Sequence, residues 1–172
     1  DAINSILNQS HRNFELIIID DNSDDDTNSI LNSFSDSRIK IIKNDERVGL
    51  VNSLNIGIDL ARGRFIARMD ADDIAKPSRL KEEFYYLKCN PDCVLVGSWF
   101  IKFNGNRYKK CKLPTNCRYL STILLLHNTF AHPTIMGYSN IFKKLKYREY
   151  YEDAEDYDLI IRFSKYGKIV NI

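Results

Sequence analysis

The sequence is poor in the features that mark disulfide-rich, zinc-stapled or membrane-spanning proteins. It holds only four cysteines, with no paired CxxC motif and no histidine at zinc-ligand spacing beside them, so neither a disulfide framework nor a structural zinc site is expected. Its apolar runs, such as Ile123–Leu126, end after a few residues, far short of the roughly 20 that cross a bilayer. The first residues also lack the basic and then apolar pattern of a secretion signal. We therefore expect free thiols in the cytoplasm.

Acidic and basic residues are distributed unevenly, and long stretches carry charge of one sign only. The totals, 25 Lys and Arg against 23 Asp and Glu, nevertheless leave a net charge of only +2. Acidic blocks lie at residues 20–26, 70–73 and 149–158, and residues 102–118 carry six basic residues and no acid. A basic run is ordinarily a solvated face, but this one also suits an anionic polysaccharide or a membrane-linked lipid carrier. Nucleic acid is not an expected partner, because no recognised binding module accompanies the basic residues.

Short apolar strands alternate along the chain with longer helical patterns, and a hydrophobic fraction of 44% suits one globular domain of 172 residues. Strands are predicted at 16–19, 38–42, 64–69, 94–103 and 168–172, extended chain at 133–136, a hairpin turn at 104–106, and helices at 2–8, 24–34, 48–61, 76–88, 118–126 and 154–165. This alternation predicts a three-layer α/β/α sandwich with a mainly parallel central sheet.

Ligands of such sheets bind beyond the carboxyl ends of the strands, where two of the acidic blocks lie. In Asp70-Ala71-Asp72 two carboxylates two residues apart face the same way in an extended turn, which suits a hard divalent cation. In Asp20-Asp21-Asn22-Ser23 a carboxylate at the strand end could accept a hydrogen bond from the imide of a uracil ring, while Ser23 or Asp24 caps the next helix, and the two interpretations are compatible. Glu155 and Asp156 begin a helix, so the helix dipole alone could account for them unless one faces the metal cleft.

An ordered set of motifs covers nearly the whole chain and resembles glycosyltransferase family 2, the inverting nucleotide-sugar glycosyltransferases with the GT-A fold. The motifs are Ser5–Ser10, Phe14–Ser23, Gly49–Asn55, Ala61–Gly63, Phe65–Asp73, Pro77–Leu80, His132–Thr134 and Ala154–Leu159 with Arg162. Any one of them is weak alone, but their order and spacing together are specific. The resemblance implies a metal-dependent hexosyltransferase that moves a sugar from a nucleotide-diphosphate donor.

On the donor side, the resemblance implies roles for three aspartates. Asp21 matches the residue that recognises the uracil ring, which makes a UDP-sugar the expected donor. Asp70 and Asp72 match the DXD motif, in which Asp72 would ligate Mg²⁺ or Mn²⁺ on the diphosphate and Asp70 would contact the ribose or the ion. The cation would neutralise the charge that develops on the departing nucleoside diphosphate.

On the acceptor side, Asp156 matches the general base, which would take a proton from an acceptor hydroxyl as it attacks the anomeric carbon. Glu155 and His132 match residues on the acceptor or donor side. The family implies a glycan or lipid-linked acceptor in cell-surface polysaccharide synthesis. Because a lipid-linked acceptor is held in the membrane, we also expect peripheral contact with the inner face of the membrane.

The extent of the resemblance predicts a single domain over residues 1–172. Residues 1–103 would form its nucleotide-binding half and residues 104–172 its acceptor-side half. The first strand usual in the family, expected near the centre of the sheet, and the usual tail have no counterpart in these residues. The domain is therefore expected to be truncated at both ends.

Two alternatives stay open from the residues. In a phospho-receiver-like regulatory domain, Asp20 and Asp21 would hold Mg²⁺ and a strand-end aspartate such as Asp70 would accept phosphate. The length of the chain, the helix before the first acidic strand and the Glu155-Asp156 pair speak against it. The second alternative is a nucleotide-sugar-binding relative without catalytic activity.

Overall fold

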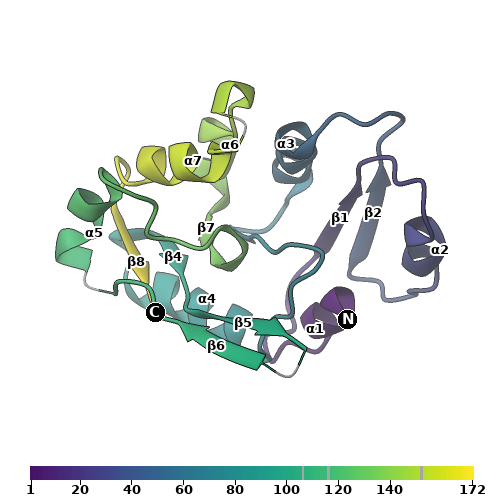
Figure 1. Cartoon of the computed structure of the whole chain (residues 1–172), viewed down its shortest axis with the longest axis horizontal. Helices are drawn as coiled ribbons and strands as arrows, with labels where there is room; N and C mark the ends of the chain where they lie inside the picture. Colours follow the sequence, from purple (N-terminus) through teal and green to yellow (C-terminus); the bar gives the residue numbers. More distant parts are fainter. Residues whose placement is uncertain (106, 116, 152) are drawn as a thin grey trace.

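Three sets of strands organise the computed structural model, which describes residues 1–105, 107–115, 117–151 and 153–172 (Figure 1). The strands are β1 (Leu16–Asp20), β2 (Ile39–Lys43), β3 (Phe65–Ala67), β4 (Cys93–Gly97), β5 (Phe100–Asn104), β6 (Arg107–Cys111), β7 (Met136–Tyr138) and β8 (Lys168–Asn171). The helices are α1 (Ala2–Leu7), α2 (Thr27–Asn32), α3 (Leu50–Leu60), α4 (Arg79–Cys89), α5 (Cys117–Leu124), α6 (Ser139–Leu145) and α7 (Glu155–Phe163), with 3₁₀ turns η1 (His132–Thr134) and η2 (Glu149–Tyr151).

The first pair, β1 and β2, is parallel and runs in register from Leu16 opposite Ile39 to Asp20 opposite Lys43. The β-branched run of β1 favours an extended chain, and α3 packs against this strand. In Figure 1 the pair lies beside α2 at one end of the molecule. The carboxyl end of β1 therefore delivers Asp20 and Asp21 to the edge at which ligands of parallel strands bind.

The second sheet has the order β3-β7-β4-β8 and joins strands from both halves of the chain. β4 is parallel to β8, whereas β7 runs antiparallel to both β3 and β4. The prediction of a mainly parallel sheet is thus confirmed, with β7 as its reversed strand. Among the described residues β1 pairs only with β2, and β3 only with β7, so no strand bridges the two sheets.

Helices cover the second sheet and complete the predicted layers. In Figure 1, α6 and α7 lie on one side of this sheet and α4 on the other. β4 is buried along its whole length, as expected for a central strand between helices. The core around it includes side chains with almost no exposure from α4, α6 and α7, namely Leu87, Phe142, Leu159, Ile160 and Phe163.

Several predicted boundaries differ from the structure, each for a local reason. The predicted strand 94–103 is two strands, because the chain turns at Ser98, whose N–H donates to Thr134 Oγ1 at 3.1 Å. The predicted extended segment 133–136 is mostly the η1 turn, and the strand begins only at Met136. The helix predicted from residue 76 begins at Arg79. The hairpin turn is confirmed by the antiparallel β5–β6 pair and by Gly105, whose φ is +56°, while Asn106 lies outside the described residues.

Candidate active site

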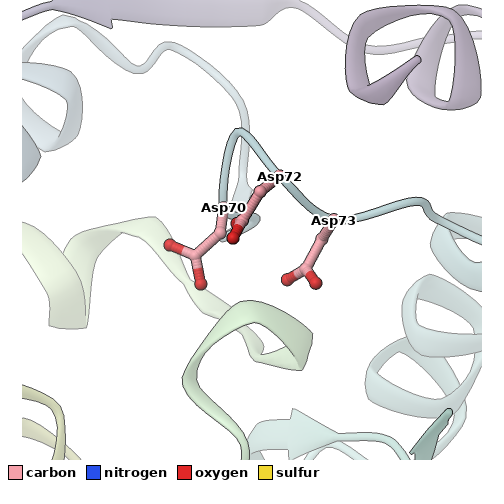
Figure 2. Close-up of side chains that lie close together, drawn as sticks. All are labelled: Asp70, Asp72 and Asp73. Atoms are coloured by element: carbon pink, nitrogen blue, oxygen red, sulfur yellow. The ribbon is translucent and has the colours of Figure 1, made fainter. Parts of the chain in front are cut away.

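Three carboxylates gather on the loop that follows β3. One carboxylate oxygen from each of Asp70, Asp72 and Asp73 lies within 4.8 Å of the others, and Figure 2 shows the three side chains on this single turn. Asp72 is exposed and the other two are half-buried. Burial, and then the charges of Asp70 and Asp72, raise the pKa of Asp73 above its usual value. The loop concentrates negative charge on oxygen ligands, which is the donor set that Mg²⁺ and Mn²⁺ prefer.

Asp70 is also paired with a buried cation. The guanidinium of Arg68 donates from Nη1 to Asp70 Oδ2 at 2.6 Å, and its Nη2 contacts Asp70 Oδ1. Arg68 is only 9% exposed but the Asp70 side chain is 39% exposed, so the pair is only partly shielded from the solvent that weakens surface ion pairs. Because both Asp70 oxygens already have a partner, Asp72 and Asp73 present the freer carboxylates of the group. The metal-ligand role expected of Asp72 stays a prediction.

The root of the loop is tied to α4 by a second buried pair. Arg79 donates from Nη2 to the Arg68 carbonyl at 2.7 Å and from Nε to Glu83 Oε1 at 3.0 Å. Glu83 is 1% exposed. Burial is the main cause that raises the pKa of Glu83 to about 7, and the neighbouring Arg79 opposes the shift. The backbone at the start of this loop is therefore tied through Arg79 to a buried carboxyl group whose pKa lies near neutrality.

The far end of the loop is held by the segment that precedes β1. Gln9 is fully buried; its Oε1 accepts the Leu80 N–H at 3.0 Å and its Nε2 donates to the Lys76 carbonyl at 2.8 Å. Ser5 Oγ accepts the Ala75 N–H at 3.0 Å. These bonds satisfy a free N–H at the start of α4. They also fix residues 75–80 directly after the three carboxylates.

Asp21 organises the loop that follows β2. Its Oδ1 accepts from Asn44 Nδ2 at 2.7 Å and from the Val48 N–H at 2.9 Å, and its Oδ2 accepts from the Gly49 N–H at 2.9 Å. The hydrogen bond from Val48 is the largest cause that keeps the pKa of Asp21 below its usual value. A side-chain hydrogen bond from Ser53 also lowers this pKa, so the carboxylate is held ionised just past the end of β1.

Asp156 lies in the first turn of α7 and is oriented from outside that helix. Asn128 donates from Nδ2 to Asp156 Oδ2 at 2.9 Å, while the Tyr157 N–H donates to Oδ1 at 2.6 Å. Tyr157 in turn donates its hydroxyl to the Leu124 carbonyl at the end of α5. Asn128 thus holds the carboxylate in one orientation, which a proton acceptor needs.

His132 and Tyr147 form a buried pair at the point where the acidic groups approach one another. His132 Nε2 lies 2.7 Å from the Tyr147 hydroxyl. Burial and then the charge of Arg68 lower the pKa of His132 to about 3, so its imidazole is neutral at physiological pH. Burial is the main cause that raises the pKa of Tyr147, and the positive charge of Arg68 opposes this shift. The charges of Asp156, Glu155 and Asp70 raise it further, so the second and third acidic blocks act on the same buried hydroxyl.

The structure groups Asp70 and Asp72 with Asp73 on one loop, the charges of Asp70, Glu155 and Asp156 act on the Tyr147 hydroxyl that contacts His132, and Asp21 lies just past the end of β1. The rest of the first acidic block serves α2 and the surface: Asp24 pairs with Arg47 at 2.9 Å, Asp25 accepts the Thr27 N–H at 2.9 Å, and Asp26 stands at the N-cap position of α2 without a side-chain cap bond. The residues that support the site, including Asp73, Arg68, Asn128 and Tyr147, were not predicted. Only Asp73 carried a signal, because it adjoins the DXD motif.

Comparison with known proteins identifies the class to which this fold and site belong. The chain aligns with the crystal structure of residues 1–349 of S. aureus TarS at a TM-score of 0.77 and 19% identity, over 99% of this chain and 52% of that chain. This likeness shows the GT-A fold. The family model described as glycosyl transferase family 2 matches residues 1–150. The chain belongs to glycosyltransferase family 2.

Relatives with curated names support the assignment. An uncharacterized glycosyltransferase of Haemophilus influenzae is 36% identical over 99% of this chain and 57% of its own length. The O-antigen biosynthesis glycosyltransferase WbnJ of Escherichia coli is 37% identical over 94% of this chain and 64% of its own length. The Escherichia coli enzyme WfgD, named as a UDP-Glc:alpha-D-GlcNAc-diphosphoundecaprenol beta-1,3-glucosyltransferase, is 34% identical over 69% of this chain and 47% of its own length.

The chain spans about half to two thirds of the length of these relatives. Within the part of the chain that the structure describes, no helix is both long and apolar enough to cross a membrane.

Proposed function

We propose that the chain transfers a sugar from a nucleotide-diphosphate donor, with a UDP-sugar as the first candidate, to a glycan or lipid-linked acceptor in surface polysaccharide synthesis. The observation that carries the proposal is the group of Asp70, Asp72 and Asp73 on the loop after β3, whose carboxylate oxygens lie within 4.8 Å of one another. In the proposal this group would bind the metal, and Asp156, held by Asn128, would accept the proton. Relatives named for O-antigen synthesis and for transfer from UDP-glucose to a lipid-linked sugar support the same substrate classes.

On the donor side, Asp72 and Asp73 would hold Mg²⁺ or Mn²⁺, with Asp70 as a further contact restrained by Arg68. The bound cation supplies the positive charge that stabilises the leaving diphosphate. Asp21 would recognise the uracil ring by accepting a hydrogen bond from its imide N–H. These residues bind the donor without forming a covalent bond to the sugar.

On the acceptor side, Asp156 would accept the proton of the attacking hydroxyl, with Asn128 holding its carboxylate. Direct attack on the anomeric carbon makes the reaction a single displacement, which inverts the configuration. Glu155 adjoins this base, and the neutral His132 offers the acceptor side an uncharged ring beside Tyr147. A cytoplasmic location with peripheral membrane contact follows if the acceptor is lipid-linked.

The test is a screen of nucleotide sugars for Mn²⁺- or Mg²⁺-dependent hydrolysis and transfer. We expect one donor class to turn over, and Asp72→Asn to lower that rate by about a hundredfold or more. Asp24→Asn is the matched control, because it removes an exposed aspartate whose partner is a surface arginine. Binding of a nucleotide sugar without any turnover would support the catalytically silent alternative. The receiver-like alternative is overturned by the family match over residues 1–150.

A further inference from the structure

The β5–β6 hairpin is a two-stranded sheet that pairs with no other strand among the described residues. Every described residue from Ile101 to Lys110 is exposed, and Figure 1 shows the hairpin along the lower edge of the molecule. An isolated pair of strands is at best marginally stable in water. A hairpin of this kind that keeps both faces open has surface available for a partner.

One face of the hairpin is apolar without being covered. The register places Phe103 opposite Tyr108 and Ile101 opposite Lys110, and residues two apart on a strand share a face. The side chains of Ile101, Phe103 and Tyr108 are 39%, 51% and 73% exposed. In an ordinary hairpin such a face would pack on the protein core. Here three large apolar side chains meet solvent on a face that also carries Lys110.

The opposite face is basic. It carries Lys102 opposite Lys109, and Arg107 follows at the turn. All three are exposed. None has an acidic neighbour in the sequence, because no aspartate or glutamate occurs between Asp92 and Glu149. The hairpin is therefore amphipathic and positively charged.

The root of the hairpin adds an aromatic side chain and two more cations. The ammonium groups of Lys110 and Lys112 lie 4.9 and 5.3 Å from the centre of the Trp99 ring. The Trp99 indole donates to the Leu113 carbonyl at 2.8 Å, which fixes the ring. Tryptophan and tyrosine, with an apolar body and a polar edge, favour the interface between membrane and water, where lysine side chains extend to the headgroups.

We propose that the β5–β6 hairpin docks on the surface of an anionic phospholipid bilayer. The apolar face would enter the boundary between headgroups and acyl chains, while the lysines and arginine contact lipid phosphates, as in interfacial amphipathic segments. An acidic polysaccharide would complement the same cations. It would not account for exposed Ile101 and Phe103, so the bilayer is the partner that both faces fit.

Docking at this position would bring the membrane beside the candidate site. The N–H of Ser98, at the base of the hairpin, donates to Thr134 Oγ1 in η1, the turn that also carries His132. A lipid-linked acceptor would then reach the site from the surface on which the hairpin rests. This consequence depends on the proposed function, whereas the docking itself does not.

The experiment is co-sedimentation of the protein with vesicles of phosphatidylcholine alone or mixed with phosphatidylglycerol. We expect binding only to the mixed vesicles, and weaker binding as salt is raised. Lys102→Gln with Lys109→Gln should raise the lipid concentration for half-binding by about thirtyfold. Phe103→Ser with Tyr108→Ser should weaken binding without removing charge. Lys40→Gln with Lys165→Gln, on β2 and after α7, removes the same charge elsewhere and should leave binding nearly unchanged.

Three results would overturn the proposal: no binding to the mixed vesicles, equal binding to both vesicle types, or the same loss in the control as in the hairpin lysine variant. Binding to an acidic polysaccharide but not to vesicles would also overturn it, in favour of a glycan partner. Donor hydrolysis measured without lipid separates the two proposals. Vesicle binding with no hydrolysis of any donor would leave docking intact and refute the enzymatic proposal.

Discussion

The side-chain amide of Asn55 in α3 forms hydrogen bonds with both the carbonyl and the N–H of Tyr147. Its Nδ2 donates to the Tyr147 carbonyl and its Oδ1 accepts the Tyr147 N–H, each at 2.9 Å. The two residues are 92 positions apart. Because the Tyr147 hydroxyl contacts His132, this pair of bonds connects α3 to the buried His132–Tyr147 pair of the candidate site.

Replacing Asn55 tests that connection. Asn55→Ala leaves both backbone groups of Tyr147 without their partner, and we expect the free energy of unfolding to fall by about 1–3 kcal/mol. Urea denaturation measures the change. Asn52→Ala is the control, because the Asn52 amide in α3 donates to the carbonyl of Val48, just before the helix, and it should cost less. Equal losses in the two variants would show that the bonds to Tyr147 contribute little.

The Glu83 carboxyl predicts a pH dependence of stability. Its pKa is raised from 4.5 to about 7 in the folded protein, so the folded state holds a proton that the unfolded state has lost between these values. The contribution to stability is fully present below about pH 4.5 and is lost as the pH rises through about 7. Glu83→Gln removes this titration.

The measurement compares unfolding of Glu83→Gln and the parent chain by urea at pH 5 and pH 8. We expect the variant to gain stability relative to the parent as the pH rises, by about 3 kcal/mol at most for a shift of this size. Glu82→Gln, an exposed neighbour on α4, should show no comparable change. A difference that stays constant with pH would contradict the raised pKa of Glu83.

If Asp156 is the general base, replacing it should slow the transfer step and leave donor binding unchanged. Asp156→Asn keeps the shape of the side chain but removes its ability to accept a proton, so transfer should fall by about a hundredfold to ten-thousandfold. Calorimetric binding of UDP with Mn²⁺ should change little. Asn128→Ala, which loses the bond that orients Asp156, should give a smaller fall in rate. An equal loss of binding and transfer in Asp156→Asn would argue against a base.

Gln9 should influence metal binding without touching the metal. Gln9→Leu leaves the Leu80 N–H and the Lys76 carbonyl without their partner, which releases the segment that follows the three carboxylates. We expect the free energy of unfolding to fall by about 1–3 kcal/mol and Mn²⁺ affinity, followed by electron paramagnetic resonance, to weaken. Asn8→Ala, at an exposed neighbouring position, is the control. Unchanged Mn²⁺ affinity in a folded Gln9→Leu protein would refute the link.

Much of the fold was predictable because its signals are local. The β-branched run at 16–19 and the alternation with helical patterns correctly indicated a layered α/β structure, and the carboxyl ends of β1 and β3 were found from the aspartates that follow them. The ends of strands and helices were predicted less accurately where a side chain far away in the sequence forms a hydrogen bond to the backbone. Thr134 accepts the Ser98 N–H and breaks the predicted long strand, although the two residues are 36 positions apart.

The sequence by itself determined the family, the order of the motifs and the carboxylates placed at strand ends, because each depends on residues close together in the chain. Only the tertiary structure decided which side chains share a site. The bond from Asn128 to Asp156 and the field of Asp70 at Tyr147 depend on sheet order and helix packing, which no local pattern specifies. The small net charge likewise concealed an exposed basic hairpin, because composition records how many charges a chain has and folding decides where they lie.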